Sequence, residues 1–217
     1  MQDHDRPITP TAIPTATPMT ALNLLVIPAS ARQGSLNRQL ATFAAGQAQA
    51  AGLVATELDL RALALPVYDG DLEAASGVPE GAQRLLDAML ACDGVLVVTP
   101  EYNGFPTPLF INAFDWLSRI AAAPPRPSGL EATANKPVAL LSASPGPGGA
   151  LRSMNYVRQY LQMAFQMVVV PQQFALGKAQ DAFDETGVLR DGRAAQSVVQ
   201  TVTALASLAQ ALKSAKG

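Results

Sequence analysis

Short apolar runs alternate with amphipathic helical segments along most of the chain, and this alternation constrains the fold more than any other feature. The run Gly94–Thr99 is almost continuously apolar, which predicts a strand that is buried on both faces. Successive strand–helix units of this kind predict an α/β fold, in which helices cover both faces of a parallel sheet. The expected strands are Asn23–Ala29, Val54–Leu60, Gly94–Thr99, Pro137–Ser142 and Val168–Val170, the last ended by Pro171, and the expected helices are Ser35–Ala51, Gly81–Ala91, Thr107–Arg119, Gly149–Phe165 and Arg193–Ser214.

In open parallel sheets a ligand binds beyond the carboxyl ends of the strands, where the strand order reverses. The loops that follow the first, third and fourth expected strands are therefore the candidate binding loops. They are also the three stretches whose composition departs most from the rest of the chain.

The first loop combines hydrogen-bond donors with a single charge. Ser30, Arg32, Gly34, Ser35 and Asn37 lie between a strand and the start of a helix. Unpaired N–H groups at a helix start attract anions, and the hydroxyls and the guanidinium add to them, so this loop is a candidate phosphate site. The alternative is an ordinary helix cap with no ligand. Neither G-x-G-x-x-G nor G-K-[ST] is present, which favours a mononucleotide over a dinucleotide or a nucleoside triphosphate.

The second loop places Tyr102, Asn103 and Gly104 in a turn after the third strand. Backbone groups of such a turn, and an amide that both donates and accepts, are suited to the edge of a flat heterocycle. The alternative is a turn with packing aromatics only. For the aromatics of the next helix packing is the favoured interpretation, and Asp115 is either a surface carboxylate or a partner of Arg119; these aromatics are Phe110, Phe114 and Trp116.

The third loop, Ser142–Ser153, contains three glycines within four residues after Pro145. Glycine permits backbone conformations that let the chain approach a planar ligand closely. The alternative is a flexible connector. Arg152 lies near a helix start, where the helix dipole disfavours a cation, and this indicates that it interacts with another group.

The inventory of reactive side chains limits the chemistry. The 217-residue chain has one cysteine, Cys92, and one histidine, His4, so a disulfide framework and a histidine or cysteine metal site are excluded. Catalysis must then depend on a cofactor or on carboxylates. A formal net charge of −2 gives no indication of nucleic-acid binding, and no apolar run is long enough for a membrane span.

Residues 1–20 are rich in proline and threonine and lack apolar periodicity, which predicts a disordered tail before a single domain at 21–217. The tail lacks the features of a secretory signal, and we expect a cytoplasmic protein. Met1 and Met19 are both candidate starts.

The three loops together resemble the NAD(P)H-dependent FMN reductases of the flavodoxin-like fold, which include quinone, chromate and azo-dye reductases. That family shows G-S-x-R-x-x-S-x-N after its first strand, P-E-Y-N-G followed by N-A-x-D-W after its third, and S-x-S-P-G with trailing glycines and L-R after its fourth. The resemblance extends from Leu22 to Leu212, with Ala29 in place of the family's first glycine. The matching segments are Ala29–Asn37, Pro100–Gly104, Asn112–Trp116, Ser142–Gly149 and Leu151–Arg152.

The resemblance implies a three-layer α/β/α fold with a five-stranded parallel sheet in the order 2-1-3-4-5. It implies that FMN is bound, with the phosphate in the first loop and the isoalloxazine ring along the other two, and that the flavin, rather than a catalytic side chain or a metal, carries the chemistry. The resemblance also implies a homodimer or a homotetramer, because family members typically form dimers or tetramers. The implied cofactor-binding residues are Ser30, Arg32, Ser35, Leu36, Asn37, Pro100, Glu101, Tyr102, Asn103, Gly104, Ser144 and Gly146.

The implied activity is ping-pong transfer from NADPH or NADH, through the flavin, to a quinone or a similar small acceptor such as an azo dye or chromate. One alternative is a flavodoxin-like carrier of single electrons, although such carriers tend to be strongly acidic. Another is an interaction module that has lost its flavin. The sequence does not identify the physiological acceptor or choose between the two nicotinamide cofactors.

Overall fold

The computed structural model describes residues 22–215 and contains one five-stranded sheet. Its strands are all parallel and lie in the order β2-β1-β3-β4-β5. The predicted α/β class and the strand order implied by the resemblance are therefore confirmed. The strands are β1 (Asn23–Pro28), β2 (Val54–Glu57), β3 (Gly94–Thr99), β4 (Pro137–Ala143) and β5 (Val168–Leu176).

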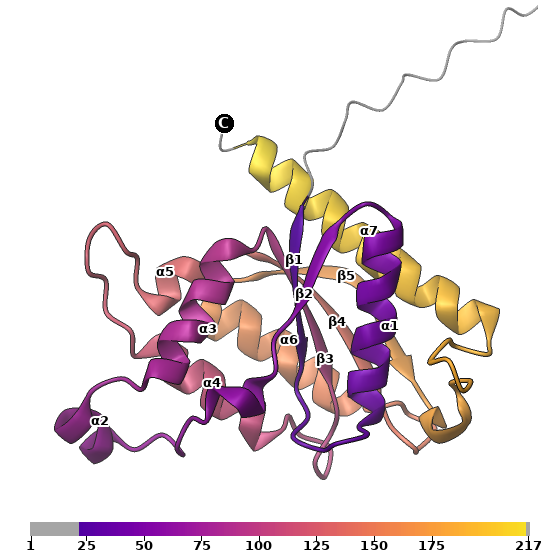
Figure 1. The fold of residues 1–217 in the computed structure, drawn as a ribbon, viewed down its shortest axis with the longest axis horizontal. Helices are drawn as coiled ribbons and strands as arrows, with labels where there is room; N and C mark the ends of the chain where they lie inside the picture. The colour runs from indigo at the N-terminus through magenta and orange to yellow at the C-terminus, as the bar shows by residue number, and fades with distance from the viewer. Residues whose placement is uncertain (1–21, 216–217) are drawn as a thin grey trace, which may run out of the picture.

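Helices cover both faces of the sheet (Figure 1). One face packs against α1 (Leu36–Ala50) and α7 (Gly192–Ser214). The apolar layer on the other face includes residues of α3 (Glu80–Ala91), α4 (Pro108–Ser118), α5 (Gly129–Thr133) and α6 (Leu151–Phe165). The short helix α2 (Gly70–Ser76) contributes no buried residue, and the described residues also form two 3₁₀ turns, η1 (Leu60–Leu63) and η2 (Ala179–Asp181). The predicted tail at residues 1–20 lies outside the described residues.

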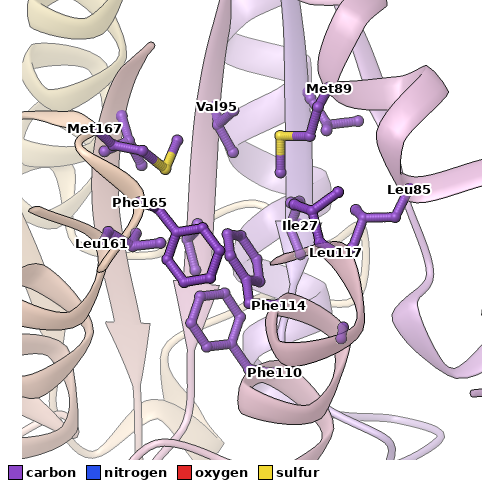
Figure 2. Packing of buried hydrophobic residues seen from close by; sticks show 14 of the residues in the cluster. Ile27, Leu85, Met89, Val95, Phe110, Phe114, Leu117, Leu161, Phe165 and Met167 are labelled. Carbon is purple, nitrogen blue, oxygen red and sulfur yellow. The ribbon is translucent and has the colours of Figure 1, made fainter. Parts of the chain in front are cut away.

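The core has two apolar layers, one on each side of the sheet, and every residue of β3 and β4 is buried between them. Phe110, Phe114 and Trp116 are fully buried, which confirms their predicted packing role. The ring centroids of Phe110 and Phe114 are 4.6 Å apart, and Phe165 packs edge-on against Phe114 at 5.0 Å (Figure 2). The indole Nε1 of Trp116 donates to the carbonyl of Pro66 at 2.8 Å, which satisfies its buried polar atom.

The prediction that Pro171 ends the fifth strand was wrong, because β5 continues to Leu176. Val169 pairs with Val138 and Gln173 pairs with Leu140, so β5 has two more residues than β4 in this interval. Pro171 lies in the resulting bulge, where the missing proline N–H removes no ladder hydrogen bond.

The second strand was predicted too long, since β2 ends at Glu57 and the chain turns into η1 at Leu60. The carboxylate of Asp59 accepts from the N–H of Arg61 at 2.9 Å and caps this turn. Asp115 is neither a free surface carboxylate nor the partner of Arg119. Arg119 pairs with Glu73 at 2.9 Å, and Asp115 accepts a hydrogen bond from the hydroxyl of Tyr160 at 3.1 Å. Helices α2 and α5 were not predicted.

Both described ends of the chain meet at the amino ends of the strands. The carboxylate of Asp93 accepts from the N–H of Asn23 at 2.9 Å and pairs with Nζ of Lys213 at 3.0 Å. The loops that leave the carboxyl ends of the strands, including the loop before α1, lie at the opposite end of the strands, toward the bottom of Figure 1. Within residues 22–215, none of the helices combines the length and the apolar character that a membrane crossing requires.

Candidate functional site

The three predicted loops meet in one pocket of about 110 Å³ at the carboxyl ends of β1, β3 and β4. Arg32 and Tyr102, from loops about 70 residues apart, both line it. Nine of the twelve implied cofactor-binding residues are therefore brought together, and the other three lie beside the pocket without lining it. The lining residues are Ser30, Arg32, Ser35, Leu36, Asn37, Pro100, Glu101, Tyr102, Ala143, Ser144 and Pro145.

The first loop turns sharply into α1 and presents the start of this helix to the pocket. Gly34 adopts the left-handed conformation with φ +64°, and Ser35 caps the helix by accepting from the N–H of Asn37 at 3.2 Å. The hydroxyl of Ser30 accepts from the N–H of Arg32 at 3.4 Å. Among residues 22–215 the guanidinium of Arg32 has no ion-pair or hydrogen-bond partner, so it is available to an anion.

Asn37 connects the first loop to the fourth strand. Its side chain donates from Nδ2 to the carbonyl of Ala143 at 2.8 Å and accepts at Oδ1 from the N–H of Ala143 at 2.9 Å. The side chain is buried, and these two bonds occupy its acceptor and one of its donor hydrogens. Asn37 therefore fixes the distance between two walls of the pocket.

The second loop is a two-residue hairpin between Tyr102 and Phe105, whose backbone N–H and carbonyl groups exchange hydrogen bonds of 2.9 and 3.0 Å. Its central residues, Asn103 and Gly104, have φ values of +55° and +89°. Positive φ at both central positions is typical of the primed turns that favour Asn-Gly. Asn103 and Gly104 thus have a backbone role, and they do not line the pocket.

Two hydroxyl groups that were not predicted as site residues stabilise the first and second loops by donating hydrogen bonds to backbone carbonyls where these loops leave their strands. Thr107 caps α4 and donates to the carbonyl of Ala29 at 2.8 Å, and Ser153 donates to the carbonyl of Pro100 at 2.8 Å. Thr107 and Ser153 are buried. Their position near helix starts was the one available signal, because serine and threonine are common helix caps. The methyl group of Ala29 packs in the core and its φ is not positive, so the sheet end accommodates alanine there.

The third loop is joined to the second by an ion pair across the rim of the pocket. Nη2 of Arg152 lies 2.8 Å from Oε1 of Glu101, and this contact raises the pKa of the Arg152 guanidinium. The pairing explains the unfavourable position of Arg152 at a helix start and offsets the negative charge of Glu101 beside the anion site. Gly149, with φ +58°, packs so closely that a Cβ would lie 2.7 Å from the backbone of Ala175. This loop is therefore packed and is more than a connector.

A hollow of about 390 Å³ adjoins the pocket and shares Glu101 and Ser144 with it. Gly146 lines this second hollow together with the glycines that follow it. Small-molecule sites commonly span about 300–1,000 Å³. The smaller pocket matches a phosphate group, with hydroxyls, a helix start and an unpaired guanidinium, and the larger hollow offers a flat ring a predominantly apolar surface beside it. The residues present therefore fit FMN.

Comparison with known proteins agrees with an FMN site. Residues 22–181 match the family model described as NADPH-dependent FMN reductase. An NAD(P)H-dependent FMN reductase of Pseudomonas aeruginosa is 32% identical over 187 residues, which cover 85% of this chain and 93% of the relative. A quinone reductase of Escherichia coli is 30% identical over 197 residues, covering 88% and 97% of the two chains.

Among solved structures, the FerB flavoenzyme NAD(P)H:(acceptor) oxidoreductase of Paracoccus denitrificans superimposes with a TM-score of 0.70 at 25% identity, covering 88% of this chain and 98% of that one. The azoreductase AzrA, at 19% identity, a TM-score of 0.53, and coverage of 87% of this chain and 99% of that one, shares the fold.

Proposed function

Because the chain belongs to the NADPH-dependent FMN reductase family, we propose that it binds FMN where the three loops meet and uses NADPH or NADH to reduce quinones. One observation carries the proposal: side chains from three loops far apart in sequence line a single pocket beyond the strand ends. The choice of quinones is supported by the quinone reductase of E. coli, which aligns along 88% of this chain.

We assign the phosphate of FMN to the first loop. Arg32 supplies the charge, the hydroxyls of Ser30 and Ser35 donate, and the N–H groups that begin at Leu36 point from the helix start. Asn37 acts as a positioning residue, because its amide is bonded to Ala143.

We assign the ring and the ribityl chain of FMN to the other two loops. Pro100, Glu101 and Tyr102 form one wall, held in shape by the turn at Asn103 and Gly104, and Ser144 and Gly146 form the other. Bound FMN supplies the hydride and electron chemistry of such enzymes. The chain binds and orients it, and no side chain is proposed as an acid, base or nucleophile. One open face used first by the nicotinamide and then by the acceptor gives ping-pong kinetics.

We also propose that the protein is a homodimer or homotetramer in the cytoplasm. Phe105 and Tyr156, stacked at 4.6 Å, remain 56% and 45% exposed, and Met163 farther along α6 is 74% exposed. Exposed apolar groups of this size support contact with a second copy near the rim of the pocket. The single thiol of Cys92 supports a reducing compartment.

The test is a visible spectrum of the protein as purified, followed in the same anaerobic cuvette by NADPH and then by a quinone. We expect a flavin spectrum that NADPH bleaches within the instrument's mixing time and that the quinone restores. Parallel lines in double-reciprocal plots would support one face used twice. A single-electron carrier would retain its colour when NADPH alone is added, and protein that remains colourless after addition of FMN would overturn the proposal.

A further inference from the structure

A second, positively charged hollow lies beside the proposed phosphate site, on the other side of the first loop. It has a volume of about 540 Å³ and is bounded by the first loop, by α1 and by the turn η1 that follows β2. Arg32 lines both this hollow and the FMN pocket, so the two sites share a wall. Three of the chain's arginines converge on this hollow, and its lining comprises Ala31, Arg32, Gln33, Gly34, Arg38, Asp59, Arg61 and Ala62.

The charge of the hollow is unbalanced. Its lining includes three guanidinium groups and one carboxylate, in a chain whose formal net charge is −2. Asp59 pairs with Arg38 at 2.6 Å and also caps η1, so this pair joins α1 to the end of β2. The pairing leaves Arg32 and Arg61 facing solvent without a carboxylate among the described residues.

Arg61 is held in place without being neutralised. Its Nη1 donates to the carbonyl of Ala31 at 3.3 Å, and its backbone N–H is fixed by the carboxylate of Asp59 at 2.9 Å. A carbonyl acceptor orients the guanidinium toward the first loop but leaves its full charge and its remaining N–H groups available. This arrangement suits a phosphate monoester, which carries a charge of about −1.5 to −2 at neutral pH and accepts paired hydrogen bonds from arginine.

We propose that this hollow binds the 2′-phosphate of NADPH, with Arg61 as the residue that distinguishes NADPH from NADH. The inference rests on the proposed function, because it assumes that the reductase takes its electrons from a nicotinamide dinucleotide. FMN has a single phosphate, which the pocket on the other side of Arg32 accommodates, so a second anion site at this rim needs a second ligand. The two dinucleotides differ by one phosphate monoester, and arginine is the side chain that commonly binds it.

The experiment measures the binding of 2′,5′-ADP and 5′-AMP to the purified protein by calorimetry, without turnover. We expect the wild-type protein to bind 2′,5′-ADP at least tenfold more tightly than 5′-AMP. In Arg61→Ala this ratio should fall at least fivefold, and in Arg61→Lys, which keeps a charge without the guanidinium fork, it should fall less. Arg84→Ala is the matched control: Arg84 donates to the carbonyls of Ala62 and Leu63 in the same turn but does not line the hollow.

Equal binding of the two nucleotides by the wild-type protein would overturn the inference. So would a fall in Arg61→Ala that is the same for both nucleotides, since this would place Arg61 at the 5′-phosphate, or a fall in Arg84→Ala as large as that in Arg61→Ala. The flavin content of each sample is measured separately from its absorbance. Protein that takes up no added FMN yet keeps the nucleotide preference would contradict the proposed function and leave this site standing, whereas flavin-loaded protein without the preference would contradict this site alone.

Discussion

The side-chain amide of Asn37, at the start of α1, forms two hydrogen bonds with the backbone of one residue 106 positions later, Ala143 at the end of β4. Asn37 and Ala143 are both buried, and the amide of Asn37 supplies hydrogen-bond partners for the backbone N–H and the carbonyl of Ala143. It holds two walls of the proposed FMN pocket at a fixed separation.

We expect Asn37→Ala to lower the free energy of unfolding by about 2 kcal/mol, because it leaves a buried N–H and a buried carbonyl unpaired. FMN binding should weaken as well, since the two walls are no longer joined. Urea unfolding and a fluorescence titration with FMN measure the two effects. Asn112→Ala is the control for FMN binding: the side chain of Asn112 also bonds one backbone N–H and one backbone carbonyl, those of Tyr68 and Pro66, in a less buried part of the molecule away from the pocket. If both variants weakened FMN binding equally, Asn37 would have no special role at the pocket.

We expect Arg32→Ala to weaken FMN binding by about 10- to 100-fold, the effect of losing a hydrogen bond to a charged group. Riboflavin, which lacks the phosphate, should bind the variant and the wild-type protein alike. Stability should change little, because Arg32 has no side-chain partner among residues 22–215. Fluorescence titrations with both flavins measure this, with Gln33→Ala as the neighbouring control. Equal losses for the two flavins would remove Arg32 from the phosphate site.

Three glycines separate backbone strain from steric contact. Gly34→Ala should cost about 1 kcal/mol, because φ +64° is strained for alanine although the added Cβ meets no atom within 4 Å. Gly149→Ala should cost about 3 kcal/mol, since its Cβ would also meet the backbone of Ala175 at 2.7 Å. Gly46→Ala, inside α1 and in open space, should stabilise the protein by about 0.5–1 kcal/mol. Thermal and urea unfolding would contradict this account if the order were different.

Burial raises the pKa of the Cys92 thiol above its ordinary value of 9.0, so the native protein keeps it protonated. The resulting stability is complete below pH 9 and is lost as the pH rises through the range in which the unfolded thiol ionises first. We expect the native protein to resist a thiol reagent at pH 8 and to react once urea unfolds it. Cys92→Ala should show a smaller loss of stability between pH 8 and pH 10. Rapid labelling of native protein would contradict the burial of Cys92.

The regular parts of the fold could be predicted because each has a local signal. The apolar run of β3 and the helical spacing of α7 depend only on residues that are close in sequence. The meeting of the three loops follows from the common direction of parallel strands. Short elements such as α2, which has no buried residue, produce no apolar pattern and were missed. The continuation of β5 past Pro171 depends on a bulge that the partner strand defines.

The hydrogen bonds that hold the loops in place could not be predicted from the sequence, because each bond joins residues that are distant in sequence. Asn37 looked like a phosphate ligand from its place in the first loop, and only the position of Ala143 shows its two occupied bonds. The same is true of Thr107 and Ser153, whose hydroxyls reach backbone carbonyls of other loops. Asn103 and Gly104 stay predicted ligand contacts, and their positive φ values show that each also has a backbone role in the turn.

Asp93 contacts both the first strand, at Asn23, and the last helix, at Lys213, near the amino ends of the strands and opposite the three loops. An attachment made through residues before Leu22 or after Ala215 therefore starts on the far side of the molecule from the pocket. A solid support, a reporter protein or an electrode attached beside Leu22 or Ala215 would leave the rim around Arg32 and Tyr102 facing the bulk solution.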